Sequence, residues 1–87
     1  MIELLKVKTS SKPNAVATAI ANILKSQGKL KVQAVGAGSI NQAVKSLAIA
    51  RSHLVLSGND LTITPVFKEV IIDSESKTAI CFITNLI

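Results

Sequence analysis

Aromatic residues are almost absent from this chain of 87 residues, which has two phenylalanines and neither tryptophan nor tyrosine. Many proteins that bind single-stranded nucleic acids stack bases on aromatic side chains, so the composition argues against that mode of recognition. Cysteine and histidine are also scarce, with Cys81 and His53 the one residue of each type. One cysteine cannot form an internal disulfide, and the two residues are too few for a metal-ligand set. We therefore expect neither a metal nor another cofactor.

Long hydrophobic runs are missing too. No stretch approaches a membrane span, and the first residues do not have the charged leader and apolar run of a signal peptide. We expect a cytoplasmic protein without a membrane partner. Cys81 lies in an apolar run, where a small buried side chain is more typical than a nucleophile. No nucleophile or carboxylate is matched with His53, whose place near a helix end suits the negative end of the helix dipole, so an enzyme is not expected.

Acidic residues are few, with five against ten lysines and arginines, which gives a net charge of +5 and a pI near 9.7. So basic a small protein favours a polyanionic partner, nucleic acid first. A hydrophobic content of 48% excludes a disordered tail. The length allows a single domain, residues 1–87, whose core is small enough that self-association would be a natural supplement.

Alternating and helical hydrophobic periodicities predict the order β-α-β-α-β-β. The expected strands are 2–8, 29–35, 61–73 and 78–84, and the expected helices are 14–27 and a segment that follows Ser39 and ends before the turn at 57–60. Short β-α-β connections imply a parallel pair with right-handed crossovers, and the last two strands form an antiparallel hairpin around a polar loop at 73–77. Pro65 implies a bend or an edge position in its strand. The predicted fold is an α/β (α+β) two-layer sandwich, a mixed sheet with both helices on one face.

A turn with two glycines, Gly36 and Gly38, connects the second strand to the second helix. Ser39 and Gln42 have the capping-box spacing, in which each side chain bonds a backbone N–H of the other residue. Free N–H groups and the helix dipole make such a turn a seat for an anion, and glycine leaves room for a phosphate. The structural alternative is that any tight strand-to-helix turn favours glycine.

The last hairpin is apolar on both faces, although a strand in a two-layer domain buries only one. The second covering surface is expected to be another copy of the chain. The expected contacts in a homodimer or larger assembly are Ile49, Ile71, Ile80 and Phe82. Ile49 is included because it lies nearly opposite the predicted buried stripe of its helix. That stripe comprises Ile40, Ala43, Val44, Leu47 and Leu54, and it also contains Arg51, for which we expect capping of helix carbonyls or an intersubunit salt bridge.

Several segments resemble the stage V sporulation protein S family. They are KVKTSSKPNAV at 6–16, QAVGAGSINQAVK at 33–45, AIAR at 48–51 and SGNDL at 57–61. The resemblance runs nearly end to end. More distantly, the central segment is similar to the core motif of the Alba family of chromatin and RNA-binding proteins, and Lys12 falls where that family has a lysine before its first helix.

This resemblance implies an Alba-like fold, dimerisation, and nucleic-acid binding through the loop before each helix and through the hairpin. It also implies a regulatory role in spore development, affecting coat assembly and core dehydration. Two departures weaken the implied contacts. Ala37 and Ser39 stand where Alba proteins usually have arginines beside the glycine, and the hairpin tip at 73–77 is net acidic.

The nucleic-acid hypothesis assigns phosphate contacts to Lys12, Gly36, Ala37, Gly38, Ser39, Asn41 and Lys45. These contacts would position the partner without reading its sequence, since nothing resembles a recognition helix. Lys12 and Lys45 could equally be solvated surface lysines, and Asn41 could hold the turn through its amide. The alternative hypothesis is a structural or regulatory module that binds a protein. An enzyme is the least favoured class, because the turn departs from the dinucleotide fingerprint at its third glycine.

Overall fold

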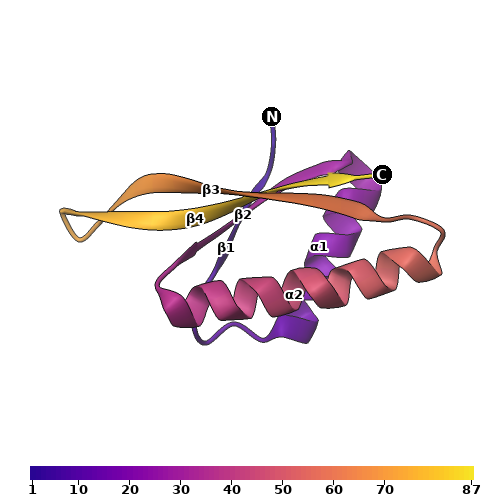
Figure 1. The fold of residues 1–87 in the computed structure, drawn as a ribbon, viewed down its shortest axis with the longest axis horizontal. Helices are drawn as coiled ribbons and strands as arrows, with labels where there is room; N and C mark the ends of the chain where they lie inside the picture. Colours follow the sequence, from indigo (N-terminus) through magenta and orange to yellow (C-terminus); the bar gives the residue numbers. More distant parts are fainter.

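The computed structural model describes residues 1–87 and has two helices and one four-stranded sheet. The elements are β1 (Leu4–Val7), α1 (Pro13–Gln27), β2 (Lys29–Val35), α2 (Ala37–Leu56), β3 (Leu61–Ile72) and β4 (Glu75–Leu86). The strand order is β1-β2-β4-β3, with β1 parallel to β2 and the other pairs antiparallel. Both helices cover the same face of the sheet (Figure 1). The predicted element order, mixed sheet and two-layer sandwich are therefore confirmed.

Local chemistry sets the two ends of α1. Pro13 occupies the first turn, where its missing N–H costs nothing, and Gly28 ends the helix in the left-handed conformation with φ 79°. Ile20 and Leu24 of α1 are fully buried. Neither α1 nor α2 is long and apolar enough to traverse a lipid bilayer.

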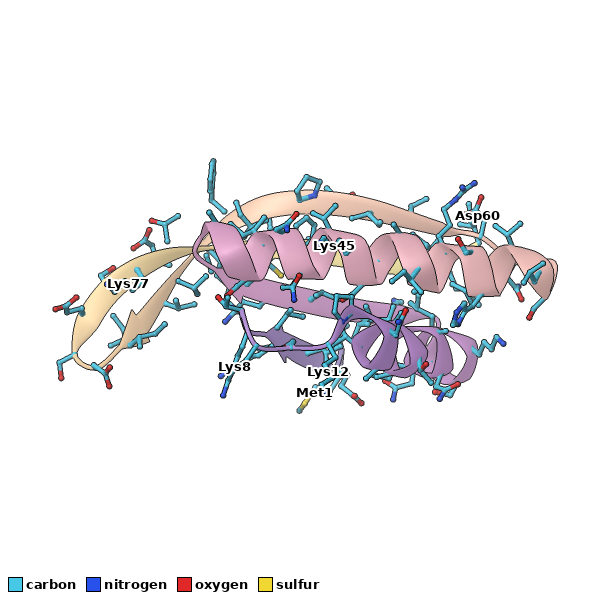
Figure 2. All side chains as sticks on the ribbon, turned by 90° about the horizontal axis from the view of Figure 1, so that it is seen from below. Met1, Lys8, Lys12, Lys45, Asp60 and Lys77 are labelled. Carbon is cyan, nitrogen blue, oxygen red and sulfur yellow. The ribbon has the colours of Figure 1, made fainter.

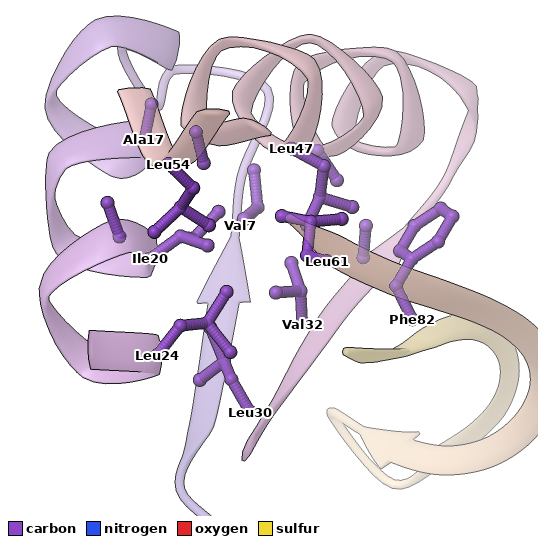
Figure 3. Packing of buried hydrophobic residues seen from close by; sticks show 14 residues of the cluster. Val7, Ala17, Ile20, Leu24, Leu30, Val32, Leu47, Leu54, Leu61 and Phe82 are labelled. Atoms are coloured by element: carbon purple, nitrogen blue, oxygen red, sulfur yellow. The ribbon is translucent and has the colours of Figure 1, made fainter. Parts of the chain in front are cut away.

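The core lies between the helices and the inner part of the sheet (Figure 3). Its buried side chains are Val7, Ala17, Ile20, Ala21, Leu24, Leu30, Val32, Ala34, Ala43, Leu47, Ala50, Leu54, Leu61 and Phe82. Alternate residues of β2 supply three of them, as a strand with one face against helices requires. Cys81 is buried and has a free thiol, as expected from its apolar run.

Gln33 is a buried polar residue on the face of β2 opposite the helices. Its residue is only 7% exposed, although it points away from the helices. β2 has a neighbour on each side, and Gln33 is paired with Lys6 of β1 and Cys81 of β4. These flanking strands cover the glutamine, which a pattern of alternating residues in one strand cannot indicate.

The buried face of α2 also differs from the prediction. Val44, expected in the buried stripe, is 50% exposed, whereas Ile49, expected to be exposed in a monomer, is half-buried and packs against the core. The buried residues of this helix are Ser39, Ala43, Ser46, Leu47, Ala50 and Leu54. Four of these six are alanine or serine. The face of α2 that packs against the core is therefore the one whose small side chains permit close approach, and not the one with the largest apolar residues.

The hairpin is longer than predicted. Asp73 and Ser74 form a two-residue turn with φ 51° and 64°, so that β3 and β4 each have twelve residues and no polar loop at 73–77 exists. Two positive φ angles match the turn that fits the twist of paired strands. β3 is an edge strand, as Pro65 suggested. The distal half of the hairpin projects beyond the helices (Figure 1), and the molecule measures 43 × 26 × 16 Å.

Candidate nucleic-acid interface

The turn between β2 and α2 forms without the predicted capping box. Gly36 is the N-cap residue with φ 87° and ψ 154°, no side chain caps the helix, and α2 begins at Ala37. Ser39 is therefore inside the helix and is buried. Because glycine alone adopts this backbone conformation readily, the chain enters the helix earlier than a serine cap would allow.

Ser39 and Gln42 instead connect α2 to the loop between β1 and α1. The Gln42 Nε2 donates to the backbone oxygens of Ser11 at 2.9 Å and Thr9 at 3.4 Å. The Oγ atoms of Ser39 and Thr9 are 3.3 Å apart and share a hydrogen bond. These contacts could not be predicted from the sequence, since a glutamine at this helix position can reach either its own N-cap or a neighbouring loop. The loop before α1 and the start of α2 thus lie together as one unit.

Gly38 makes this close approach possible. A Cβ atom at Gly38 would lie 3.1 Å from Thr9 Oγ1 and 3.2 Å from Thr9 Cγ2, which is tighter than ordinary van der Waals contact. The second glycine of the turn therefore has a packing role against the neighbouring loop. Gly36 has a conformational role, since nothing lies within 4 Å of the Cβ that it would carry.

Backbone N–H groups are free at the start of α2. The first turn bond is donated by Ile40 to the Gly36 oxygen at 3.0 Å, and the amides of Ala37, Gly38 and Ser39 have no protein acceptor. No acidic residue lies in this turn, and Gly36, Ala37 and Gly38 are exposed. Free donors at the positive end of a helix dipole favour an anion.

The lysine before α1 lies in the adjoining loop. Lys12 is the exposed N-cap residue of α1, in extended conformation and without a side-chain cap. Asn41 and Lys45 are exposed and one turn apart on α2, so they share one face of that helix. In Figure 2, Lys8 and Lys12 lie at one edge of the molecule, and Lys45 projects from α2. Lys8, which the sequence analysis did not assign, adds a further cation to this loop.

The distal hairpin offers little free positive charge. Glu69 accepts hydrogen bonds from Ser76 at 2.6 Å and Thr78 at 2.8 Å, and these bonds hold the pKa of its carboxyl below the usual value. Lys77 pairs with Glu75 at 3.2 Å. Lys68 and Asp73 of the distal hairpin have no side-chain partner, so Lys68 is its one unpaired cation, and the tip at 73–77 is net acidic.

Arg51 differs from the prediction. It is exposed and forms a two-point contact with Asp60 of the same chain, with Nε–Oδ1 2.9 Å and a second hydrogen bond to Oδ2 of 3.1 Å. The guanidinium lowers the pKa of Asp60, and the carboxylate raises that of Arg51. Arg51 therefore does not cap helix carbonyls, and its carboxylate partner lies in its own chain. His53 is exposed in the last turn of α2.

The four residues predicted to mediate self-association lie in different environments. Ile71 is 72% exposed, whereas Phe82 is buried within the core of its own chain. Ile49 and Ile80 are half-buried and pack against that core. Ile71 therefore keeps the most surface for a partner, and that it contacts another copy stays a prediction.

These features define a class: a small α+β domain in which hydrogen bonds join the start of α2 to the lysine-bearing loop before α1. The family model described as stage V sporulation protein S matches residues 3–86. The chain belongs to the stage V sporulation protein S family. The resemblance inferred from the sequence is confirmed over almost the entire chain.

Proposed function

We propose that this member of a sporulation-related family binds nucleic acid through the phosphate backbone, without sequence preference and without catalytic activity. The supporting observation is that the loop before α1 is joined to the start of α2. The loop contributes Lys12, and the first turn of α2 contributes the unbonded amides of Ala37, Gly38 and Ser39. Asn41 and Lys45 extend the same surface along α2.

The absence of groove-reading elements supports a backbone mode of binding. The hairpin has an acidic tip, and the exposed basic side chains of α2 are Lys45, His53 and Arg51, of which Arg51 is paired with Asp60. Contacts to phosphate position a protein on a duplex but carry no base information. With about three phosphate contacts per protomer, the slope of log K against log salt would be only about −2.7.

The test is fluorescence anisotropy with labelled duplex DNA, single-stranded DNA and RNA across a salt series. We expect weak binding that is similar for mixed sequences. Lys12→Ala and Lys45→Ala should each lower the affinity. Each should also reduce the steepness of log K against log salt by about 0.9, the contribution of one phosphate contact. Lys29→Ala removes the same charge at the opposite end of β2 and is the matched control. No binding at low salt, or an equal effect of all three variants, would refute the proposal.

We further propose that the functional form is a homodimer. β3 presents exposed apolar side chains on the same face as the helices but beyond their cover, including Ile63, Phe67 and Ile71. An apolar groove of about 310 Å³ between α2 and the hairpin, lined in part by Val44 and Phe82, continues this surface. Contiguous apolar surface on so small a domain is typical of an interface.

The same exposed hairpin favours an alternative, a non-enzymatic module that binds another protein in spore development. This alternative predicts that a protein carrying both Lys12→Ala and Lys45→Ala retains its partners in a pull-down after nuclease treatment. Loss of those partners after nuclease treatment would favour the nucleic-acid function.

A further inference from the structure

A second hollow lies beside the loops that precede the helices, on the side of the distal hairpin. It has a volume of about 470 Å³ and is bounded by the ends of β1 and β2 on one side and the distal hairpin on the other. Small-molecule sites commonly have volumes of about 300–1,000 Å³. Of the residues described above at the candidate nucleic-acid interface, Lys8 and Ser39 reach its lining, whereas Lys12 and Lys45 do not.

The walls of this hollow are aliphatic. Leu4 and Val35 contribute from β1 and β2, and Val70 and Ile72 contribute from β3. No aromatic ring lines it, so it offers no stacking surface for a base or another flat ring. An apolar ligand portion would be a flexible or branched aliphatic group.

Three lysines surround the apolar walls: Lys6, Lys8 and Lys68. None of them forms a salt bridge, because the two ion pairs of the chain are Arg51–Asp60 and Lys77–Glu75. No carboxylate lines the hollow. The electrostatic complement is therefore a negatively charged group.

Gln33 supplies a third and independent feature. It lines the hollow, is only 7% exposed, and its Oε1 has no hydrogen-bond partner. Buried side-chain amides are normally hydrogen-bonded, so an unbonded oxygen on a residue that lines a hollow points to a donor supplied from outside.

We propose that this hollow binds an aliphatic carboxylic acid that also has a hydroxyl or amide N–H near its carboxylate. The hydrocarbon part contacts the aliphatic walls, the carboxylate lies among the lysines, and the donor hydrogen-bonds to the Gln33 amide. A second copy of the chain fits this place less well. With ten basic against five acidic residues, it would bring more positive charge toward the same lysines.

The test is a titration of the isotope-labelled full chain, without nucleic acid, followed by amide NMR shifts. The probe is N-octanoylglycine below its micelle concentration. N-octanoylsarcosine, which has no N–H, and N-octanoylglycinamide, which has no charge, are the comparison probes. We expect shifts at the Gln33 side-chain amide and around the hollow. Loss of the N–H should weaken binding about 3- to 10-fold, and loss of the charge should weaken it about tenfold.

Three variants locate the site. A protein with Lys6→Met and Lys68→Met should bind N-octanoylglycine about tenfold more weakly. Lys45→Met, which removes the same charge from α2, should not change the affinity. Gln33→Met should abolish the preference for the N–H probe over its N-methyl counterpart.

Three results would overturn the proposal: equal affinity for all three probes, shifts centred on Ile63 and Phe67, which do not line the hollow, or shifts around the hollow on protein dilution without a probe. The last would mean that a second copy occupies it. Because the lysines tested here differ from Lys12 and Lys45, failure of this proposal leaves nucleic-acid binding untouched, and the reverse also holds.

Discussion

Gln33 places a polar amide where its neighbours are closely packed. Its unbonded Oε1 has lost contact with water without gaining a protein donor. Methionine has nearly the same shape and no group that needs a hydrogen bond. We expect Gln33→Met to raise the free energy of unfolding by about 1 kcal/mol in urea titrations. Gln27→Met, at an exposed site, should change it little, and a clear loss of stability in Gln33→Met would contradict the assignment of an unbonded amide.

Arg51 and Asp60 link stability to pH. The hydrogen bonds from Arg51 and from the Leu61 amide lower the pKa of Asp60 in the folded chain. Their contribution is therefore present above the pKa of about 3.9 of an unfolded aspartate, and it disappears as the pH falls through the lower folded value. Glu69 acts in the same direction.

We expect the difference in thermal midpoint between the wild type and Asp60→Asn to be greatest near neutral pH and to vanish in strong acid. Thermal denaturation followed by circular dichroism at several pH values measures it. Asp73→Asn, which removes a hairpin carboxylate without a protein partner, is the control and should follow the wild type. A difference that grows in acid would reverse the assigned sign.

At the level of elements, the start of α2 depends on two glycines for different reasons. Gly36→Ala should lower the free energy of unfolding by about 1–3 kcal/mol. There is room for the new Cβ, but an alanine backbone is strained at this positive φ. Urea denaturation measures this loss. Gly28 also has a positive φ, so Gly28→Ala should be destabilising as well, but without the loss of nucleic-acid affinity expected at residue 36.

Gly38→Ala tests the packing of the two loops. Alone, it should be destabilising, because the new Cβ presses on Thr9. In a Thr9→Ala background, the contacted atoms are gone, and alanine at residue 38 should be neutral or stabilising by up to about 1 kcal/mol through helix propensity. Urea denaturation of the four proteins of this cycle measures the coupling, and strictly additive effects would contradict it.

The order of elements was predictable because strands and helices here carry clear hydrophobic periods. The bounds of α2 and its buried face were not. Its apolar residues occur almost all round the helix, so small residues such as Ala43 and Ser46 decide the packing, and those give a weak sequence signal. The glycine turn was recognisable as a site, whereas the partners of Ser39 and Gln42 depend on a loop some thirty residues away.

At the scale of the whole molecule, exposed apolar surface on the hairpin leads to a prediction about assembly. Sedimentation at micromolar concentration should give a species of at least twice the 9.1 kDa of one chain. Phe67→Ser with Ile71→Ser should shift it toward the monomer, since these side chains are 81% and 72% exposed and support no internal packing. Leu56→Ser, at the exposed end of α2, is the matched control, and a monomeric wild type would contradict the dimer.

The edge strand β3 bears on how such copies can associate. It is twelve residues long and pairs on one side only, with β4. Pro65, close to its middle, has no N–H, so the row of donors that another strand would need is interrupted. Continuous addition of strands at this edge is thereby disfavoured, and contact between faces remains open. We accordingly expect copies to associate as closed particles and not as filaments that extend from β3.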